Sequence, residues 1–496
     1  MAPGSRFGMN KTPTREVALV DEFAKLPSET SWVEFKVNNY RPELIGTLIS
    51  AISNAARLND ERCGYVVWGI DNSHNIVGTK FQPAAEMVQD QPLEFWLARR
   101  LSPSINFRFK DVHHTKGRLV MLEIPAAEQV TTKFENIAYL RIGQTTPKLA
   151  DFPVREAALL SKLKPFVWES GVARAFVQSA EVIKLLDIAA YFTLGEQPVP
   201  NTDDGICSIL AHDKILFKDV GGRWDISNLG AILFAKDIAE FDNISRKAMR
   251  VIEHDTGSRA TTIKERSGKL GYAAGFEGLI EYINKRLPRR EVIGRALRVP
   301  QPVYPEIAIR ELVANALIHQ DFAISGAGPV VDIFPDRVEV SNPGAPLVET
   351  RRLIDFPPRS RNETMAALLR RLGMCEEQGS GIDKVIIAAE EGQLAPPDFQ
   401  DEGYNMRATL FARKTFGAMS QEERVRGCYQ HCVIRYLANQ GMTNSTLRQR
   451  FGVAERNASQ ISRVIKQTQE AGLIKPSDVW SSRGGHYLPS WASKLS

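Results

Sequence analysis

The chain has 496 residues, of which 43% are hydrophobic and 24% are charged, and its net charge at pH 7 is +5. This length is too great for one hydrophobic core, so we expect three or four domains of ordinary soluble composition. No apolar run is long enough to span a bilayer, and the start has no apolar signal segment, which predicts a cytoplasmic protein without a membrane anchor. The mildly basic balance permits a polyanionic partner without requiring one.

Residues 1–20 are rich in glycine, proline, threonine and basic side chains, and we expect a flexible leader there. The next stretch, residues 21–152, mixes helical and strand patterns. Residues 42–53 have helical spacing with a proline in the first turn, and residues 118–124 and 137–142 are typical of strands. We therefore expect this stretch to fold as an α+β module.

Three acidic residues flank the first predicted strands of this module. Glu29 and Glu34 lie five positions apart at the entry of a short apolar run, and Asp71 ends a second strand-forming run. If the three carboxylates converge at one end of a sheet, they could hold Mg²⁺ or Mn²⁺, with Lys36 placed to meet a phosphate group. That arrangement is typical of a phosphodiesterase. The alternative is that these are solvated acids at strand ends, which are common.

The motifs around these acids resemble one family. They are Glu29-xxxx-Glu34-Phe-Lys, Ser50-Ala-xx-Asn54, Gly64-xxxx-Gly69-Ile-Asp71, Val77-Gly78 and Ala138-Tyr-Leu-Arg-Ile-Gly143. Over residues 26–150 they are similar to the Schlafen AlbA-like nucleic-acid-binding domain. The resemblance implies that Glu29, Glu34 and Asp71 support RNA cleavage with a divalent metal, although many bacterial relatives are described only as nucleic-acid-binding or regulatory proteins. The chain departs from the family pattern after Asn54, where a longer loop replaces an Asn-xx-Gly-Gly motif.

Residues 153–240 are mainly helical and are expected to form a connector of winged-helix type. In the next predicted domain, residues 241–414, one helix carries a polar stripe: Glu311, Asn315 and His319 recur at i, i+4 and i+8, opposite an apolar face. An acid and an amide one turn apart can share Mg²⁺ through water, while the acid orients an attacking water. This pattern suits nucleotide hydrolysis.

Further along, Gly379-Ser380-Gly381 forms a predicted bend before a helix, where backbone N–H groups can bind phosphate. The polar helix, the segment Asn342-Pro-Gly344 and this glycine-rich bend follow one another in the chain. Together they resemble the GHKL (histidine-kinase-like) ATP-binding fold over residues 300–413. The resemblance implies that Glu311 is the general base, that Asn315 binds Mg²⁺, and that the glycine-rich bend lies beside the phosphates. Asn342-Pro-Gly344-Ala-Pro stands where typical members have Asp-x-Gly-x-Gly, which favours ATP binding over fast turnover.

The last predicted domain, residues 415–496, reads as three helices followed by a hairpin, and it resembles a winged helix-turn-helix. In that family the third helix enters the DNA major groove. The residues expected to contact nucleic acid are Asn457, Gln460, Arg463 and Lys466 on that helix and Arg483 in the wing. The alternative is a winged helix that contacts protein, because the density of basic residues is only moderate.

These patterns support two hypotheses. The first is a nucleotide-gated, metal-dependent endonuclease acting on RNA of the tRNA type, with ATP and Mg²⁺ or Mn²⁺ as cofactors and a role in defence or stress. The second is a non-enzymatic, ATP-responsive regulator that binds DNA. Either is expected to be a homo-oligomer with a nucleic-acid partner. An ordinary ATPase motor is disfavoured, because the chain has no Walker-type Gly-x-x-x-x-Gly-Lys-Ser/Thr motif.

Overall fold

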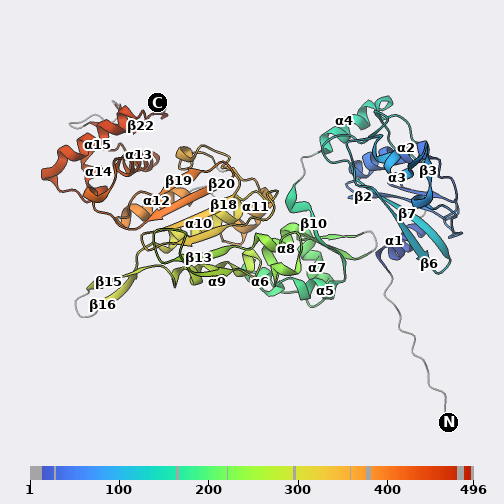
Figure 1. The fold of residues 1–496 in the computed structure, drawn as a ribbon, viewed down its shortest axis with the longest axis horizontal. Coiled ribbons are helices and arrows are strands. Elements are labelled where there is room, and N and C mark those ends of the chain that lie inside the picture. The colour runs from blue at the N-terminus through green and yellow to red at the C-terminus, as the bar shows by residue number, and fades with distance from the viewer. Residues whose placement is uncertain are drawn as a thin grey trace, which may run out of the picture. The chain divides into compact units, whose positions relative to one another are not determined.

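The computed structural model describes residues 14–26, 30–163, 167–219, 222–293, 298–357, 359–375, 381–477 and 485–492, with only the backbone of residues 290–293 and 298–301. The chain divides into two compact units, Met1–Val167 with Lys218–Arg223 and Trp168–Phe217 with Trp224–Ser496 (Figure 1). Both mix helices with sheets, which confirms the predicted α+β multidomain class. Within the described ranges, no helix is both long and apolar enough to cross a membrane.

The first unit is built on a four-stranded sheet in the order β1-β2-β7-β6, in which β1 and β2 run parallel and the other neighbours antiparallel. Its strands are β1 (Val33–Lys36), β2 (Cys63–Trp68), β6 (Arg108–His114) and β7 (Gly117–Pro125). Its helices are α1 (Arg15–Ala24), α2 (Pro42–Leu58), α3 (Leu93–Ala98) and α4 (Pro153–Lys162). The short strands β3 (Met87–Val88), β4 (Gln91–Pro92), β5 (Leu101–Ser102), β8 (Lys133–Phe134) and β9 (Ile137–Ala138) form two small sheets.

Helices cover both faces of this sheet because successive side chains of a strand point to opposite faces. On β2, Val66 and Trp68 pack with apolar residues of α2 and α3, whereas Tyr65 and Val67 pack with those of α1. Glu34 on β1 is in register with Val66. Neighbours in register share a face, so the Glu34 side chain lies on the same face of the sheet as α2.

The second unit begins with the connector. Its three-stranded sheet has the order β10-β12-β11. The connector elements are β10 (Val172–Val177), α5 (Ser179–Leu185), α6 (Ile188–Leu194), α7 (Asp203–His212), β11 (Leu216–Lys218), β12 (Trp224–Ser227) and α8 (Asn228–Phe234). Thr202, Asp187 and Ser227 cap the N-termini of α7, α6 and α8 by accepting backbone N–H bonds.

A six-stranded sheet in the order β14-β13-β17-β18-β20-β19 follows, with β13 parallel to β17 and all other neighbours antiparallel. Its strands are β13 (Arg250–His254), β14 (Thr262–Ser267), β17 (Val330–Ile333), β18 (Arg337–Pro343), β19 (Asp398–Asp401) and β20 (Asn405–Phe411). The helices are α9 (Tyr272–Asn284), α10 (Glu306–Ile318), α11 (Glu363–Arg371) and α12 (Gly381–Glu391), and β15 (Arg289–Ile293) pairs with β16 (Arg298–Pro302). Helix α10 packs against α12, α9 and β18, which sets its polar stripe beside the sheet.

The C-terminal part consists of α13 (Gln421–Leu437), α14 (Asn444–Phe451), α15 (Ala458–Glu470) and the hairpin of β21 (Ile474–Ser477) and β22 (His486–Pro489). A capping box between Ser420 and Glu423 begins α13, and Gly452, in the left-handed conformation, ends α14. This order of three helices and a hairpin agrees with the order read from the sequence.

One hydrophobic cluster runs from the connector through the six-stranded sheet to the C-terminal helices. The sequence reading separated these parts at residues 240 and 414. These parts lie in one compact unit, within which apolar side chains of neighbouring parts bury each other, and the boundaries at 240 and 414 stay predictions.

Candidate functional site

Glu34 is the best-defined of the predicted acids. It lies on β1, only 2% exposed, and its carboxylate forms ion pairs with Lys36 and with Arg141, which is equally buried. Sequence reasoning gave Arg141 no role. An arginine inside the apolar run Tyr139-Leu140-Arg141-Ile142 is a signal that it needs a buried partner. The structure therefore brings Glu34 and Lys36 together, and places a second cation on the same carboxylate.

Asp71 makes a different set of bonds. Its carboxylate accepts the backbone N–H of Ser73 at 2.9 Å and of Asn75 at 2.8 Å, an arrangement that closes the turn after β2. The hydrogen bond from Asn75 is the main reason why the pKa of Asp71 is lowered. Glu29, the third predicted acid, lies outside the described residues.

Two of the three acids of the predicted divalent-metal site, Glu34 and Asp71, lie among the described residues. Among the described residues, no three His, Cys, Asp or Glu side chains are grouped so that they could hold a metal ion. The Glu34 carboxylate is already paired with two cations, and the Asp71 carboxylate accepts hydrogen bonds within the turn after β2. Among the described residues, the carboxylates of Glu34 and Asp71 are thus engaged with separate partners. The convergence of Glu29, Glu34 and Asp71 stays a prediction.

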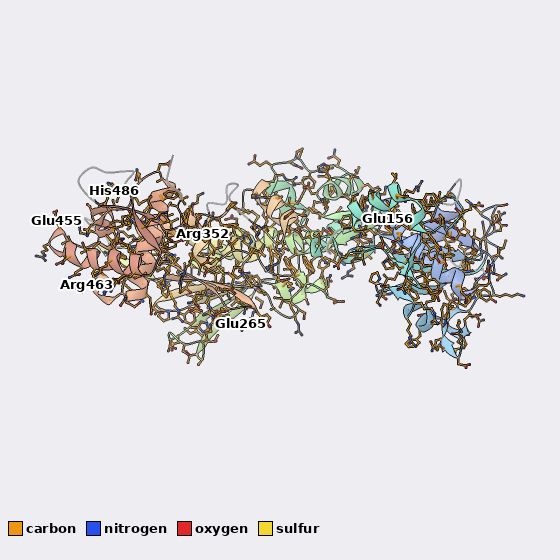
Figure 2. All side chains as sticks on the ribbon, turned by 90° about the horizontal axis from the view of Figure 1, so that it is seen from above. Glu156, Glu265, Arg352, Glu455, Arg463 and His486 are labelled. Atoms are coloured by element: carbon orange, nitrogen blue, oxygen red, sulfur yellow. The ribbon has the colours of Figure 1, made fainter. Side chains whose placement is uncertain are left out.

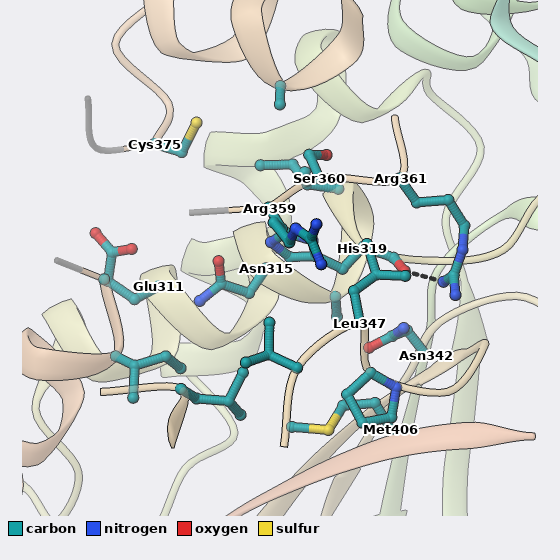
Figure 3. A pocket seen from close by; sticks show the side chains of 18 of the residues that line it. Glu311, Asn315, His319, Asn342, Leu347, Arg359, Ser360, Arg361, Cys375 and Met406 are labelled. Carbon is teal, nitrogen blue, oxygen red and sulfur yellow. Dashed lines mark hydrogen bonds between the residues drawn. The ribbon is translucent and has the colours of Figure 1, made fainter. Parts of the chain in front are cut away.

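The polar stripe of α10 lines a pocket of about 950 Å³ in the second unit. Glu311, Asn315 and His319 are half-buried along it, while the apolar face of Ile309, Leu312, Val313 and Ala316 is buried, as the spacing predicts. Asn342 of β18 and Gly381 at the start of α12 line the same pocket. Figure 3 shows Glu311, Asn315 and His319 in succession along one side, and Asn342 across from them.

Gly381 lies so close to this stripe that a side chain here would require the Glu311 carboxylate to move. A Cβ atom at this position would be 2.6 Å from Oε2 of Glu311 and 3.6 Å from Nδ2 of Asn315. The start of α12 therefore meets the acid and the amide directly. Gly379 and Ser380, the rest of the predicted phosphate-binding bend, lie outside the described residues.

Asn342 and Gly344 stand in the segment that departs from the family motif. Asn342 is buried, lines the pocket and donates Nδ2–H to the carbonyl of Pro343 at 3.2 Å. Gly344 is not among the lining residues. Its backbone has a φ of +104°, which favours glycine, and its N–H donates to the Tyr404 carbonyl at 2.7 Å. Gly344 therefore shapes the backbone next to the pocket.

The pocket walls differ in polarity. Apolar side chains from α10, β18 and β20 include Leu312, Val340 and Met406. Arg361 is held by the carbonyls of His319 at 3.2 Å and Ala345 at 3.1 Å. Burial, with Arg361 nearby, lowers the pKa of His319 to about 4, so this imidazole is neutral at pH 7. A mainly apolar pocket of this size with a few polar groups suits a nucleotide.

The predicted nucleic-acid-binding residues lie on the C-terminal helices. Gln460, Arg463 and Lys466 are exposed on α15, whose opposite face is buried, and Asn457 is half-buried just before the helix. Figure 2 marks Arg463 on this helix. Arg483 lies outside the described residues. Three of the five residues thus share an exposed surface.

The fold and the pocket define a multidomain α+β protein with a nucleotide-sized site. Residues 29–150 match the family model "Schlafen, AlbA_2", and residues 326–410 match HATPase_c_4, "Putative ATP-dependent DNA helicase recG C-terminal". The chain therefore carries a Schlafen AlbA_2 domain and, further on, a GHKL-like ATPase domain, which confirms the predicted resemblance to both. Together these domains indicate an ATP-dependent function related to nucleic acid.

No curated protein matches the chain. Among solved structures, it is similar to the crystal structure of the DIP2311 protein from Corynebacterium diphtheriae, with 18% sequence identity and a TM-score of 0.42. That similarity covers 95% of this chain and 96% of the other.

Proposed function

We propose that this protein is an ATP-binding regulator that binds nucleic acid, and that nucleotide in the pocket controls its C-terminal helices. The observation that carries the proposal is the pocket itself, in which Glu311, Asn315, Asn342 and Gly381 meet around a volume of about 950 Å³. Asn315 would bind the Mg²⁺ that accompanies ATP, since an amide oxygen is an ordinary Mg²⁺ ligand.

The wall of the pocket is bonded to the C-terminal helices. Leu353 lines the pocket, and two residues before it the carbonyl of Arg351 accepts the hydroxyl of Tyr429 on α13 at 3.1 Å. The Arg352 guanidinium lies 4.5 Å from the ring centre of Trp491, and the Trp491 indole donates to the Tyr429 hydroxyl at 3.1 Å. A nucleotide that binds two arrangements of this wall with different affinity would shift the C-terminal helices.

The C-terminal helices supply the nucleic-acid surface in this proposal, as a winged helix-turn-helix. The exposed side chains of Gln460, Arg463 and Lys466 lie on one face of α15, in the position of a recognition helix. The AlbA_2 domain would add a second contact to nucleic acid.

The metal-dependent RNA endonuclease is the second candidate, and the observation in its favour is that Lys36, the cation predicted to meet a phosphate group, lies beside Glu34. The buried Arg141 on the same carboxylate supports the regulator instead, because a cation already takes the place where a metal would be needed. Incubation of the protein with tRNA and Mn²⁺ or Mg²⁺ separates the two. Cleavage by the parent that is lost both in Glu34→Gln and in Asp71→Asn, which leaves the Glu34–Arg141 pair intact, would support the endonuclease.

The regulator is tested by nucleotide and DNA binding in one preparation. Calorimetry should show ATP binding with Mg²⁺, weakened about tenfold or more in Asn315→Ala, because the loss of a metal-linked polar contact corresponds to about 1.5–3 kcal/mol. Fluorescence anisotropy with duplex DNA should show an affinity that changes when ATP is added. Equal ATP binding by the parent and the variant would contradict the assignment of the pocket.

A further inference from the structure

The pocket includes one residue from well outside the segment that matches the ATPase family. Lys214 of the connector lines it, together with Glu363 and Arg370 of α11. Lys214 belongs to the turn between α7 and β11. The connector is therefore part of the pocket wall.

The turn that carries Lys214 is fixed to α11 by several bonds. The adjacent Asp213 forms an ion pair with Arg371 of α11, with Nη1 at 2.9 Å from Oδ1, and also accepts the hydroxyl of Tyr191. Ser227 donates its hydroxyl to the Lys214 carbonyl at 2.8 Å. Lys214 itself has a φ of +59°, a conformation that L-residues adopt only where the surroundings hold it. The position of the lysine at the pocket is thus set by the fold.

Three of the cations that line the pocket have no partner among the residues that the structure describes. Among the described residues, the side chains of Lys214, Arg359 and Arg370 make no hydrogen bond or ion pair, whereas Arg361 is bound to two carbonyls. Figure 3 shows Arg359 extending over the pocket near Asn315. With His319 neutral, the described lining residues include four cations and two acids, Glu311 and Glu363. The lining is therefore complementary to an anion with several charges.

We propose that Lys214 binds the terminal phosphates of the nucleotide, so that the connector senses whether the pocket holds a triphosphate. This inference rests on the proposed function and adds a contact from outside the matched ATPase segment. The base and sugar contact the apolar residues of α10, β18 and β20 on the sheet side of the pocket. The phosphates contact Lys214, Arg359 and Arg370. Because Asp213 ties the same turn to α11, the contact links phosphate binding to the connector.

The test measures how affinity depends on the number of phosphates. Calorimetry of the full chain with ATP, ADP, AMP and inorganic tripolyphosphate is compared for the parent, Lys214→Met and Lys184→Met. Methionine keeps the length of the side chain without its charge. Lys184 is an exposed lysine of the same connector, on α5, and it does not line the pocket.

Lys214→Met should bind ATP at least about tenfold more weakly, the size of a lost charge-assisted contact, and should bind AMP as the parent does. Lys184→Met should match the parent throughout. ATP binding by Lys214→Met equal to that of the parent would overturn the inference and leave the proposed function standing. Loss of AMP and ATP binding in equal measure would also overturn it. A parent that binds no nucleotide would overturn the proposed function itself.

Two further measurements keep the result clear. Lys214→Arg retains the charge and should preserve the ratio of ATP to AMP affinity within about threefold, even if Lys214→Met folds poorly. Tripolyphosphate should bind more weakly than ATP, because it lacks the base and sugar that the apolar wall contacts. If tripolyphosphate binds as tightly as ATP, the pocket is a site for inorganic polyphosphate, and the assignment of a nucleotide to it is wrong.

Discussion

The ion pair of Glu34 with Arg141 allows a quantitative prediction, which tests whether Glu34 has a structural or a catalytic role. Both residues are 2% exposed, so Glu34→Gln removes the Glu34 charge from a buried guanidinium. Removing one partner of a buried pair costs about 3–5 kcal/mol. Lys36, whose side chain is 26% exposed, can turn to water and adds little to this cost.

Native-state hydrogen exchange is the appropriate assay, because it reports the opening of β1 separately from the second unit. We expect the β1 amides of Glu34→Gln to lose about 3 kcal/mol or more of protection. Asp71→Asn is the matched control: it removes an exposed charge from a turn and should change protection by less than about 1 kcal/mol.

The double variant Glu34→Gln/Arg141→Gln should recover part of the loss, since it removes both charges of this pair. Protection of β1 in Glu34→Gln equal to that in the parent would refute the reasoning. The acid would then be free of Arg141 in solution and available for metal binding, and the endonuclease would be the better hypothesis.

Two more predictions concern the start of α12. Burial and the nearby Asp355 raise the pKa of Asp383 to about 6, so the folded state binds this proton more tightly than the unfolded state does. Below about pH 4 the Asp383 carboxyl is protonated in both the folded and the unfolded state, and it costs no stability. The cost grows as the pH rises from about 4 to about 6, and it is fully present above that range. Asp383→Asn should therefore stabilise the second unit by about 1–2 kcal/mol at pH 7.5 and have little effect at pH 4. Thermal unfolding at both pH values checks this, and a gain of equal size at pH 4 would contradict it. Gly381→Ala should displace the Glu311 carboxylate and weaken ATP binding by about 1 kcal/mol, measured by calorimetry; an unchanged affinity would show that the carboxylate does not face the ligand.

Local patterns predicted the elements of the pocket well. The recurrence of Glu311, Asn315 and His319 follows the period of a helix, and any amphipathic helix must turn such a stripe away from its apolar side. The order of motifs also predicted the two matched domains, because each motif lies on neighbouring residues. These features depend on short stretches of chain, and a sequence shows them directly.

The sequence alone determined the fold class, the two recognised domains and the polar stripe of α10, because these arise from periodicity and motifs within single elements. Only the tertiary structure decided that Arg141 is the partner of Glu34, that Lys214 reaches the pocket, and that the connector shares a core with the ATPase-like domain. Such contacts join residues far apart in the chain, and they form wherever buried charge finds a counter-charge and apolar faces exclude water. No local pattern specifies which distant residue will be the partner.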